Sequence, residues 1–137
     1  MRFLIDTNVV LDVLLARDPF CDPAQRVLSL SQRDDVEEYV SASAITDIYY
    51  IARRQLKDRD LTKDLIKRLI SVVSVAAVSE KEIETALNLP WPDFEDSVQY
   101  AVALLSDFDA IVTRDAIDYY DSKVRVMSPE QILSELA

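Results

Sequence analysis

The chain has 137 residues, which is enough for one domain with a hydrophobic core and too few for two comfortable ones, so we expect a single domain over residues 1–137. It contains no histidine, and this excludes Ser/His and Cys/His catalytic triads and histidine-based zinc sites. It also contains no glycine, which excludes the glycine-rich loops that cradle nucleotide phosphates. The net charge of −10 argues against binding nucleic acid by overall charge alone.

Targeting and redox signals are absent from the chain. No apolar stretch approaches the roughly 20 residues of a membrane span, and no cationic stretch followed by an apolar run opens the sequence. Cys21 is the only cysteine, so no internal disulfide can form. We therefore expect a soluble, cytoplasmic protein.

Five short apolar runs alternate with helical patterns along the chain. The first run, FLI at 3–5, lacks in/out alternation, as expected of a strand buried on both faces. Strands that alternate with helices favour parallel pairing, so the pattern predicts an α/β fold, a three-layer α/β/α domain. The other expected strands are 39–42, 75–78, 110–113 and 124–127.

Helix starts are expected where a capping residue precedes a helical pattern. A cap followed by proline, or a serine with Glu or Gln three residues on, is typical of a first helical turn. The expected starts are Asp22-Pro23, Ser43, Ser79 with Glu82, and Ser128-Pro129 with Gln131.

Acidic residues adjoin several of the predicted strands. Ligands of parallel sheets bind beyond the carboxyl ends of the strands, so these positions are candidates for a site. Asp6 ends the first strand, and Asp47 lies about one turn into the helix after the second. Converging carboxylates would repel one another unless a cation lay among them, and Mg²⁺ or Mn²⁺ suits oxygen ligands. The other acids are Asp93, Glu95 and Asp96 before the fourth strand, and Asp115 and Asp118 after it.

Each acid also has a purely structural interpretation. Acidic side chains in the first turn of a helix stabilise it, which would explain Asp93, Asp96 and Asp115. Asp47 would then be a solvated helix residue. Asp6 would be a turn cap, although it closes a buried strand and has no evident cation to pair with. The convergence of acids from four segments is what favours a functional site.

Several of these segments together resemble a known family. The chain is similar to PIN-domain ribonucleases, and among them to the toxin subunits of VapBC toxin–antitoxin pairs, from Met1 to the segment at 127–133. The resemblance implies a four- to five-stranded parallel sheet of order 3-2-1-4-5 and acids that bind Mg²⁺ or Mn²⁺ for cleavage of single-stranded RNA. It also implies a homodimer and an antitoxin encoded next to the chain. The segments that carry it are DTN at 6–8, the acid after the second strand, FED at 94–96 and IVTRD at 111–115.

The resemblance also implies which acids are catalytic. Asp6, Asp96 and Asp115 match acids of the family and are expected to hold the metal. Asp47 stands where the family usually has glutamate, and because it is one methylene shorter we expect it to act through water. Relatives often carry asparagine with a following aspartate at the fourth position, so Asp118 competes with Asp115. We favour Asp115 because it is closer to the strand end.

Three further residues are expected to contact the substrate. Asn8 matches the asparagine that accompanies the first acid of the family, and Thr113 matches its hydroxyl position. Arg53 lies beyond Asp47 in a basic stretch and is expected to contact a flanking phosphate, although a solvated helix face is the commoner meaning of such a stretch. Without a histidine base, the attacking water has to be activated by the metal ion.

Other functions share some of these features. A phosphatase of the haloacid-dehalogenase type also ends its first strand on an aspartate, but it needs a second aspartate two residues on, where this chain has Asn8. A receiver-like signalling domain needs a phosphoacceptor after a later strand, and VAAVSE at 75–80 supplies none. A degenerate PIN fold that only binds a partner is consistent with Asp47 in place of glutamate.

Overall fold

The computed structural model describes residues 1–137 and contains a five-stranded sheet in the order β3-β2-β1-β4-β5. Every neighbouring pair is parallel, and Leu4 of the central strand lies between Tyr39 and Ile111 in the register. The α/β architecture and the strand order expected from the sequence are therefore confirmed. The strands are β1 (Arg2–Ile5), β2 (Glu37–Ser41), β3 (Ser74–Ala76), β4 (Ala110–Val112) and β5 (Arg125–Met127).

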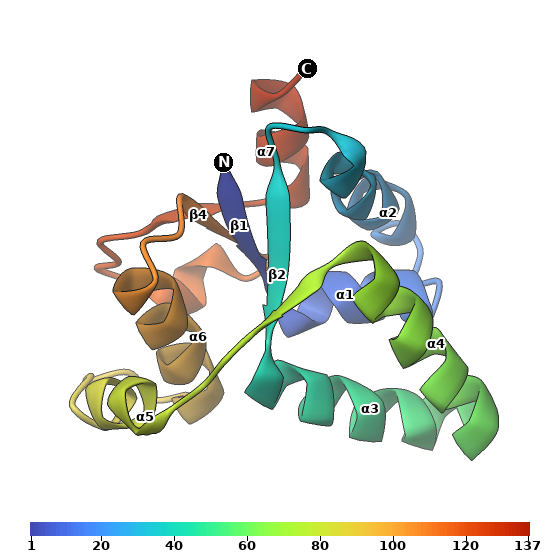
Figure 1. The fold of residues 1–137 in the computed structure, drawn as a ribbon, viewed down its shortest axis with the longest axis horizontal. Helices are drawn as coiled ribbons and strands as arrows, with labels where there is room; N and C mark the ends of the chain where they lie inside the picture. Colours follow the sequence, from blue (N-terminus) through green and yellow to red (C-terminus); the bar gives the residue numbers. More distant parts are fainter.

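Helices cover both faces of this sheet. In Figure 1, α1, α2 and α4 lie on one side of the strands, and α5 and α6 lie on the other. β2 runs directly into α3, which starts at the carboxyl end of the sheet. None of the helices is long and apolar enough to cross a membrane. The helices are α1 (Thr7–Leu14), α2 (Cys21–Ser29), α3 (Ala42–Leu56), α4 (Arg59–Val72), α5 (Glu80–Leu87), α6 (Phe94–Leu105) and α7 (Pro129–Glu135), with short 3₁₀ helices η1 (Leu30–Gln32) and η2 (Ala116–Tyr119).

The sheet separates two hydrophobic clusters, which explains the unbroken apolar run at the start of the chain. Phe3 and Ile5 pack into one cluster with side chains from α1 to α4 and α7, whereas Leu4 packs into the other with side chains from α5 and α6. All three are fully buried. Because successive strand residues point to opposite faces, a strand covered on both faces has to be apolar at every position.

The helix starts agree only in part with the sequence expectations. Ser128 and Gln131 form the expected capping box at the start of α7. The cap of α3 is Ser41, whose side chain accepts from the Ala44 N–H, so the expectation of Ser43 is wrong by two residues. The expected start at Asp22-Pro23 is also wrong: α2 begins at Cys21, because the Cys21 N–H already bonds to the Arg17 carbonyl in the preceding turn.

Four residues adopt left-handed backbone conformations that glycine would normally supply. They have φ near 50°, and three of them follow or end the helices α1, α3 and α6. An L-residue in this region costs about 1–2 kcal/mol, which a chain without glycine must accept at its tight turns. The four residues are Ala16, Lys57, Asp107 and Asp121.

Candidate active site

Asp6 lies directly after β1 and is the N-cap residue of α1. Its backbone is extended, and its Oδ1 accepts a hydrogen bond of 2.7 Å from the Thr7 N–H. Only 4% of the residue is exposed. Asp6 is therefore a helix cap, as its structural interpretation predicts. The capping hydrogen bond uses only one of the two carboxylate oxygens, Oδ1.

Three further donors from distant parts of the chain reach the Asp6 carboxylate. Gln99 of α6 donates to Oδ1 at 3.3 Å. Thr113, just after β4, donates to Oδ2 at 2.8 Å, and the Tyr119 hydroxyl of η2 donates to the same oxygen at 3.1 Å. A carboxylate offers about four acceptor positions, so the two oxygens are fully used. Asp6 therefore joins β1 to the segments that carry the other acids.

The Asn8 side chain links this centre to Asp115. Its Nδ2 donates to the Thr113 hydroxyl and to Asp115 Oδ2, both at 3.1 Å, while its Oδ1 accepts from the Arg114 N–H at 3.2 Å. The Asp115 N–H also donates to the Thr113 hydroxyl. All polar atoms of the amide are thus paired, which holds the loop after β4 against the start of α1.

The buried Gln99 connects the site to the end of β2. Its Oε1 accepts a hydrogen bond of 2.6 Å from Ser41, and its Nε2 donates to Asp6. Gln99 is completely buried, so leaving either end unpaired would cost about 1–3 kcal/mol. The Gln99 side chain therefore holds α6, and the acids at the start of α6, against the ends of β1 and β2.

Six carboxylates line one pocket of about 320 Å³ at the carboxyl edge of the sheet. They come from the end of β1, the start of α6 and the segment after β4. Arg17 is the only basic residue among the eleven that line this pocket. The acids are Asp6, Asp93, Glu95, Asp96, Asp115 and Asp118, and the other residues are Thr7, Asn8, Leu11, Arg17 and Ile51.

Burial and repulsion between carboxylates raise the pKa values of three acids in the pocket. Burial, followed by the charges of Asp6 and other acids, raises the pKa of Asp96 to about 7. Burial and the neighbouring Asp47 carboxyl raise the pKa of Glu95 to about 7, although the hydrogen bond from the Thr7 hydroxyl acts in the opposite direction. The pKa of Asp118 is also raised, by desolvation and then by Asp115. Glu95 and Asp96 are therefore only partly ionised near neutral pH.

Most of the residues expected from the sequence are brought together. Asp6, Asn8, Asp96 and Asp115 line the pocket, and Thr113 contacts Asp6 and Asn8 behind it. Asp115 and Asp118 both line it, so neither is excluded by position. Asp93 caps α6 by accepting from the Asp96 N–H, in agreement with its structural interpretation.

Two expected residues lie outside the pocket lining. Asp47 of α3 does not line the pocket, but its carboxyl group raises the pKa of Glu95. Arg53, two turns further along α3, is also absent from the lining. The cation at the pocket is Arg17 instead, which follows α1.

Sequence reasoning overlooked several residues that shape the site. Glu95 belongs to the acidic stretch before the fourth strand, but it was not expected to be catalytic. Gln99 lies one turn after Asp96 and points to the same side of α6. No local pattern marks Arg17 or Tyr119, because their positions depend on how the segments pack.

The donor chemistry of the pocket fits a hard divalent cation. All six acids offer oxygen ligands, and burial together with neighbouring carboxyl groups raises the pKa values of Glu95 and Asp96. No three His, Cys, Asp or Glu side chains are close enough together to surround one ion, so Asp6, Asp96 and Asp115 do not form a closed cage. Mg²⁺ keeps several waters and commonly uses one or two carboxylates, so the fit does not require such a cage.

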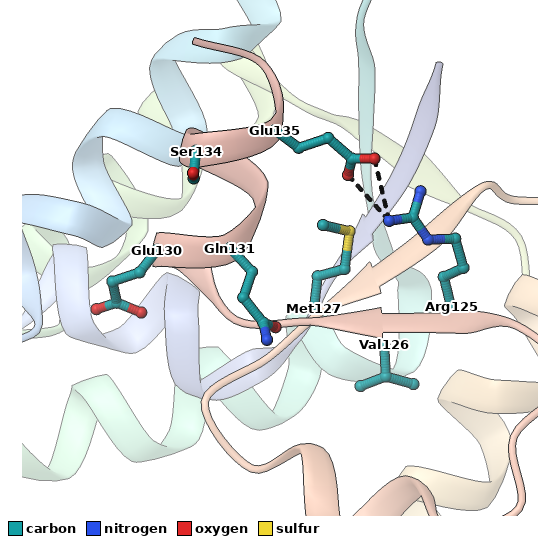
Figure 2. A pocket seen from close by; sticks show the side chains of 7 residues that line it. All are labelled: Arg125, Val126, Met127, Glu130, Gln131, Ser134 and Glu135. Atoms are coloured by element: carbon teal, nitrogen blue, oxygen red, sulfur yellow. Dashed lines mark hydrogen bonds and ion pairs between the residues drawn. The ribbon is translucent and has the colours of Figure 1, made fainter.

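The largest cavity of the molecule lies elsewhere. It has a volume of about 710 Å³ and lies between the edge strand β5 and α7 (Figure 2). An ion pair of 3.0 Å between Arg125 and Glu135 crosses it, and both side chains are substantially exposed. This open surface lacks buried polar groups, whereas the smaller acidic pocket combines burial, charge and shifted pKa values. The acidic pocket is therefore the candidate site.

Comparisons with known proteins agree with this architecture. The sequence model of the PIN domain family matches residues 2–116. No curated protein sequence matches the chain. Among solved structures, VapBC2 from Rickettsia felis, bound to a DNA fragment from its promoter, has a TM-score of 0.71 at 12% identity and covers 93% of this chain and 98% of that one.

Two other solved structures are similar. VapC20 from Mycobacterium tuberculosis, a toxin that cleaves the sarcin-ricin loop, has a TM-score of 0.64 at 18% identity, covering 80% of this chain and 86% of that one. A toxin–antitoxin complex from Klebsiella pneumoniae has a TM-score of 0.69 at 18% identity, covering 92% and 96%. At these identities the likeness shows a common fold.

Proposed function

The chain belongs to the PIN domain family, whose nucleases generally use divalent metal ions, and we propose that it is an endoribonuclease that hydrolyses phosphodiester bonds of single-stranded RNA. The observation that carries the proposal is the convergence of six carboxylates, one of them the buried Asp6, on a single pocket. A protein without histidine needs another way to activate water, and a divalent ion held by these acids provides one.

Mg²⁺ or Mn²⁺ would be held by Asp6, Asp96 and Asp115, with Asp118 as the competing fourth acid. When bound, the ion lowers the pKa of water and neutralises charge on the scissile phosphate. Four donors now occupy both oxygens of Asp6, so the ion would displace one of them while the other three keep the carboxylate in position. Asn8 and Thr113 would orient Asp115 rather than contact the substrate directly.

Glu95 takes over part of the role expected of Asp47. It lines the pocket, and its pKa of about 7 lets it hold or release a proton near neutral pH. Burial and the neighbouring Asp47 raise that pKa. The family usually carries a glutamate on the helix after the second strand. In this chain a pair would replace it, in which Glu95 lines the pocket and Asp47 raises the pKa of Glu95.

A direct assay tests the activity. Protein freed of metal with a chelator and supplied with single-stranded RNA should cleave only after Mn²⁺ or Mg²⁺ is added. Asp96→Asn should abolish this cleavage, whereas Glu130→Gln, at an exposed position in the first turn of α7, should not affect it. Cleavage that persists in excess chelator would contradict the metal-dependent mechanism.

Two alternatives remain as outcomes of the same assay. RNA that is bound in the presence of metal but never cut would favour a degenerate PIN fold that acts as a binding module. Release of phosphate from a phosphomonoester, without RNA cleavage, would favour the haloacid-dehalogenase type of phosphatase. The structure offers less support for a phosphatase, because Asn8 stands where its second aspartate is needed and all polar atoms of that amide are already paired.

An antitoxin is the proposed protein partner. Similar solved structures include VapBC2 and a complex described as toxin–antitoxin. The acidic pocket has one cation against six acids, so an arginine or lysine from a partner would complement it. A small neighbouring gene product that co-purifies with the chain and suppresses RNA cleavage would support this assignment. The absence of such a neighbour, together with harmless overexpression, would favour a housekeeping nuclease acting in the cytoplasm.

A homodimer is the proposed assembly. Large apolar side chains on α3 and α4 are exposed, among them Tyr50 at 62% and Ile70 at 47%. They lie in the segments at 45–56 and 61–73, where apolar residues recur at helical spacing. Light scattering that reports a monomer over a wide concentration range would refute this assembly.

A further inference from the structure

Arg17 is the one positive charge at the acidic pocket. Its side chain is 36% exposed, and its Nη1 lies 3.7 Å from Oδ1 of the buried Asp12. This distance is long for a charge-assisted hydrogen bond, which normally measures about 2.7–2.9 Å. The guanidinium therefore retains donors that no protein group uses at close range.

Asp12 does not depend on Arg17 for its neutralisation. Arg114 binds the same carboxylate with both ends of its guanidinium, from Nε to Oδ2 at 2.5 Å and from Nη2 to Oδ1 at 3.1 Å. The Arg114 guanidinium also lies 3.9 Å from the centre of the Phe20 ring. A bidentate pair of this kind satisfies a buried carboxylate, so Arg17 is a second and more weakly held cation.

The backbone after α1 directs Arg17 to the pocket. Ala16 has a φ of 48°, its N–H bonds to the Val13 carbonyl, and the Arg17 N–H bonds to the Asp12 carbonyl at 3.0 Å. This is the Schellman arrangement, with alanine at the position that usually carries glycine. The turn reverses the chain at the end of α1 and keeps Arg17 beside the carboxyl edge of the sheet.

We propose that Arg17 binds a phosphate of the RNA next to the scissile bond, an inference that rests on the ribonuclease function proposed above. Six acids repel the polyanion, and only this side chain of the pocket lining attracts it. A guanidinium suits the task because its planar donors match two phosphate oxygens. Arg53, expected from the sequence to make such a contact, does not line the pocket.

Salt-dependent RNA binding tests the contact. In the Asp6→Asn background, which we expect not to cleave, fluorescence anisotropy with a labelled single-stranded RNA is measured over a series of KCl concentrations. Arg17→Gln should reduce the slope of log affinity against log salt by about 0.7, the value for one phosphate contact on a single strand. Arg17→Lys should retain most of the slope. Arg26→Gln, an exposed arginine of α2 outside the pocket, should leave it unchanged.

Cleavage kinetics separate this inference from the proposed function. In the otherwise unaltered chain with Mn²⁺, Arg17→Gln should raise KM more than it lowers kcat, and its melting temperature shows whether it folds. A chain that cleaves RNA but has the same KM and salt slope with Arg17→Gln, or loses slope with Arg53→Gln instead, would overturn the role of Arg17 alone. A parent chain that does not cleave RNA would overturn both.

Discussion

The Tyr119 hydroxyl donates a hydrogen bond of 3.1 Å to Asp6 Oδ2, although 113 positions separate the two residues. Tyr119 is 2% exposed, and its ring packs edge-on against Trp91 with centroids 5.8 Å apart. Burial and the charge of Asp6 raise the pKa of Tyr119, so it remains a neutral donor. The segment after β4 is thereby attached to the residue that ends β1.

Removing this hydroxyl should destabilise the metal-free protein. Tyr119→Phe keeps the ring and its contact with Trp91 but removes one donor from the Asp6 carboxylate. Hydrogen bonds to charged groups contribute about 1.5–3 kcal/mol, so we expect a loss of that order in urea denaturation. The control is Tyr120→Phe, whose hydroxyl donates to the Pro90 carbonyl from a half-exposed ring. It should cost less than about 1 kcal/mol, and equal losses in the two variants would contradict the importance of the Asp6 contact.

Asp6→Asn should abolish cleavage while preserving the fold. The amide oxygen can still accept from Thr7 and Gln99, and the Tyr119 hydroxyl can rotate to accept from the new amide. The Thr113 hydroxyl already accepts two hydrogen bonds, so it loses only its contact with this side chain. We expect cleavage to fall at least about 100-fold because a proposed metal ligand loses its charge.

The metal-free melting temperature of Asp6→Asn should match or exceed that of the parent. Asp6 raises the pKa of Asp96 by repulsion, and removing its charge relieves this effect. An NMR titration should therefore show the pKa of Asp96 falling from about 7. A variant that is inactive only because it unfolds, or that cleaves RNA normally, would mean that Asp6 is simply a cap.

The raised pKa values of Glu95 and Asp96 predict that stability without metal falls with rising pH, whereas the stabilisation by a divalent ion increases. Both values are about 7 in the folded state, above the ordinary range of carboxyl groups. Folding therefore takes up protons, and the metal-free protein should lose stability as the pH rises from about 4 through 7. Divalent ions bind the deprotonated acids, so stabilisation by Mn²⁺ should grow over the same range. Melting temperatures with chelator and with Mn²⁺ test this, and Glu95→Gln combined with Asp96→Asn should reduce the pH dependence of both curves.

Glu38 is an unpaired acid in the middle of the sheet. It is 3% exposed, neither carboxyl oxygen has a hydrogen-bond partner, and burial raises its pKa to about 8. Because its pKa in the folded state exceeds the value of 4.5 for a free side chain, its contribution favours folding below about pH 4.5 and is lost as the pH rises towards 8. Glu38→Met should therefore stabilise the protein at about pH 8, by on the order of 1–3 kcal/mol.

The neighbouring Glu37 provides the matched control. It lies on the same strand, points to the opposite side and is exposed. Its contact with Arg2 is a surface ion pair of 3.6 Å, so Glu37→Met should change stability by less than about 1 kcal/mol. Urea denaturation at acidic and alkaline pH should show a pH-dependent gain for Glu38→Met only. A loss of stability with Glu38→Met at alkaline pH would indicate that the carboxylate has a partner.

Much of the fold could be predicted from the sequence because its signals are local. The FLI run identified a strand buried on both faces, and Ser128 with Gln131 identified the start of α7 correctly. Helix starts were less predictable where a turn extends into the helix, as at Pro23, or where the strand residue itself is the cap, as at Ser41. Those outcomes depend on backbone hydrogen bonds that composition does not reveal.

The edge at which the acids gather was predictable from the amino-acid sequence, because parallel strands end at one edge and Asp6, Asp96 and Asp115 adjoin those ends. The side chains that complete the pocket depend instead on how distant segments of the chain pack. Glu95 reaches it and Asp47 does not, and Arg17 lines it in place of Arg53. The reason is that spacing along the chain fixes the face of a helix on which a residue lies, whereas the direction in which that helix leaves the sheet is set by packing between distant segments.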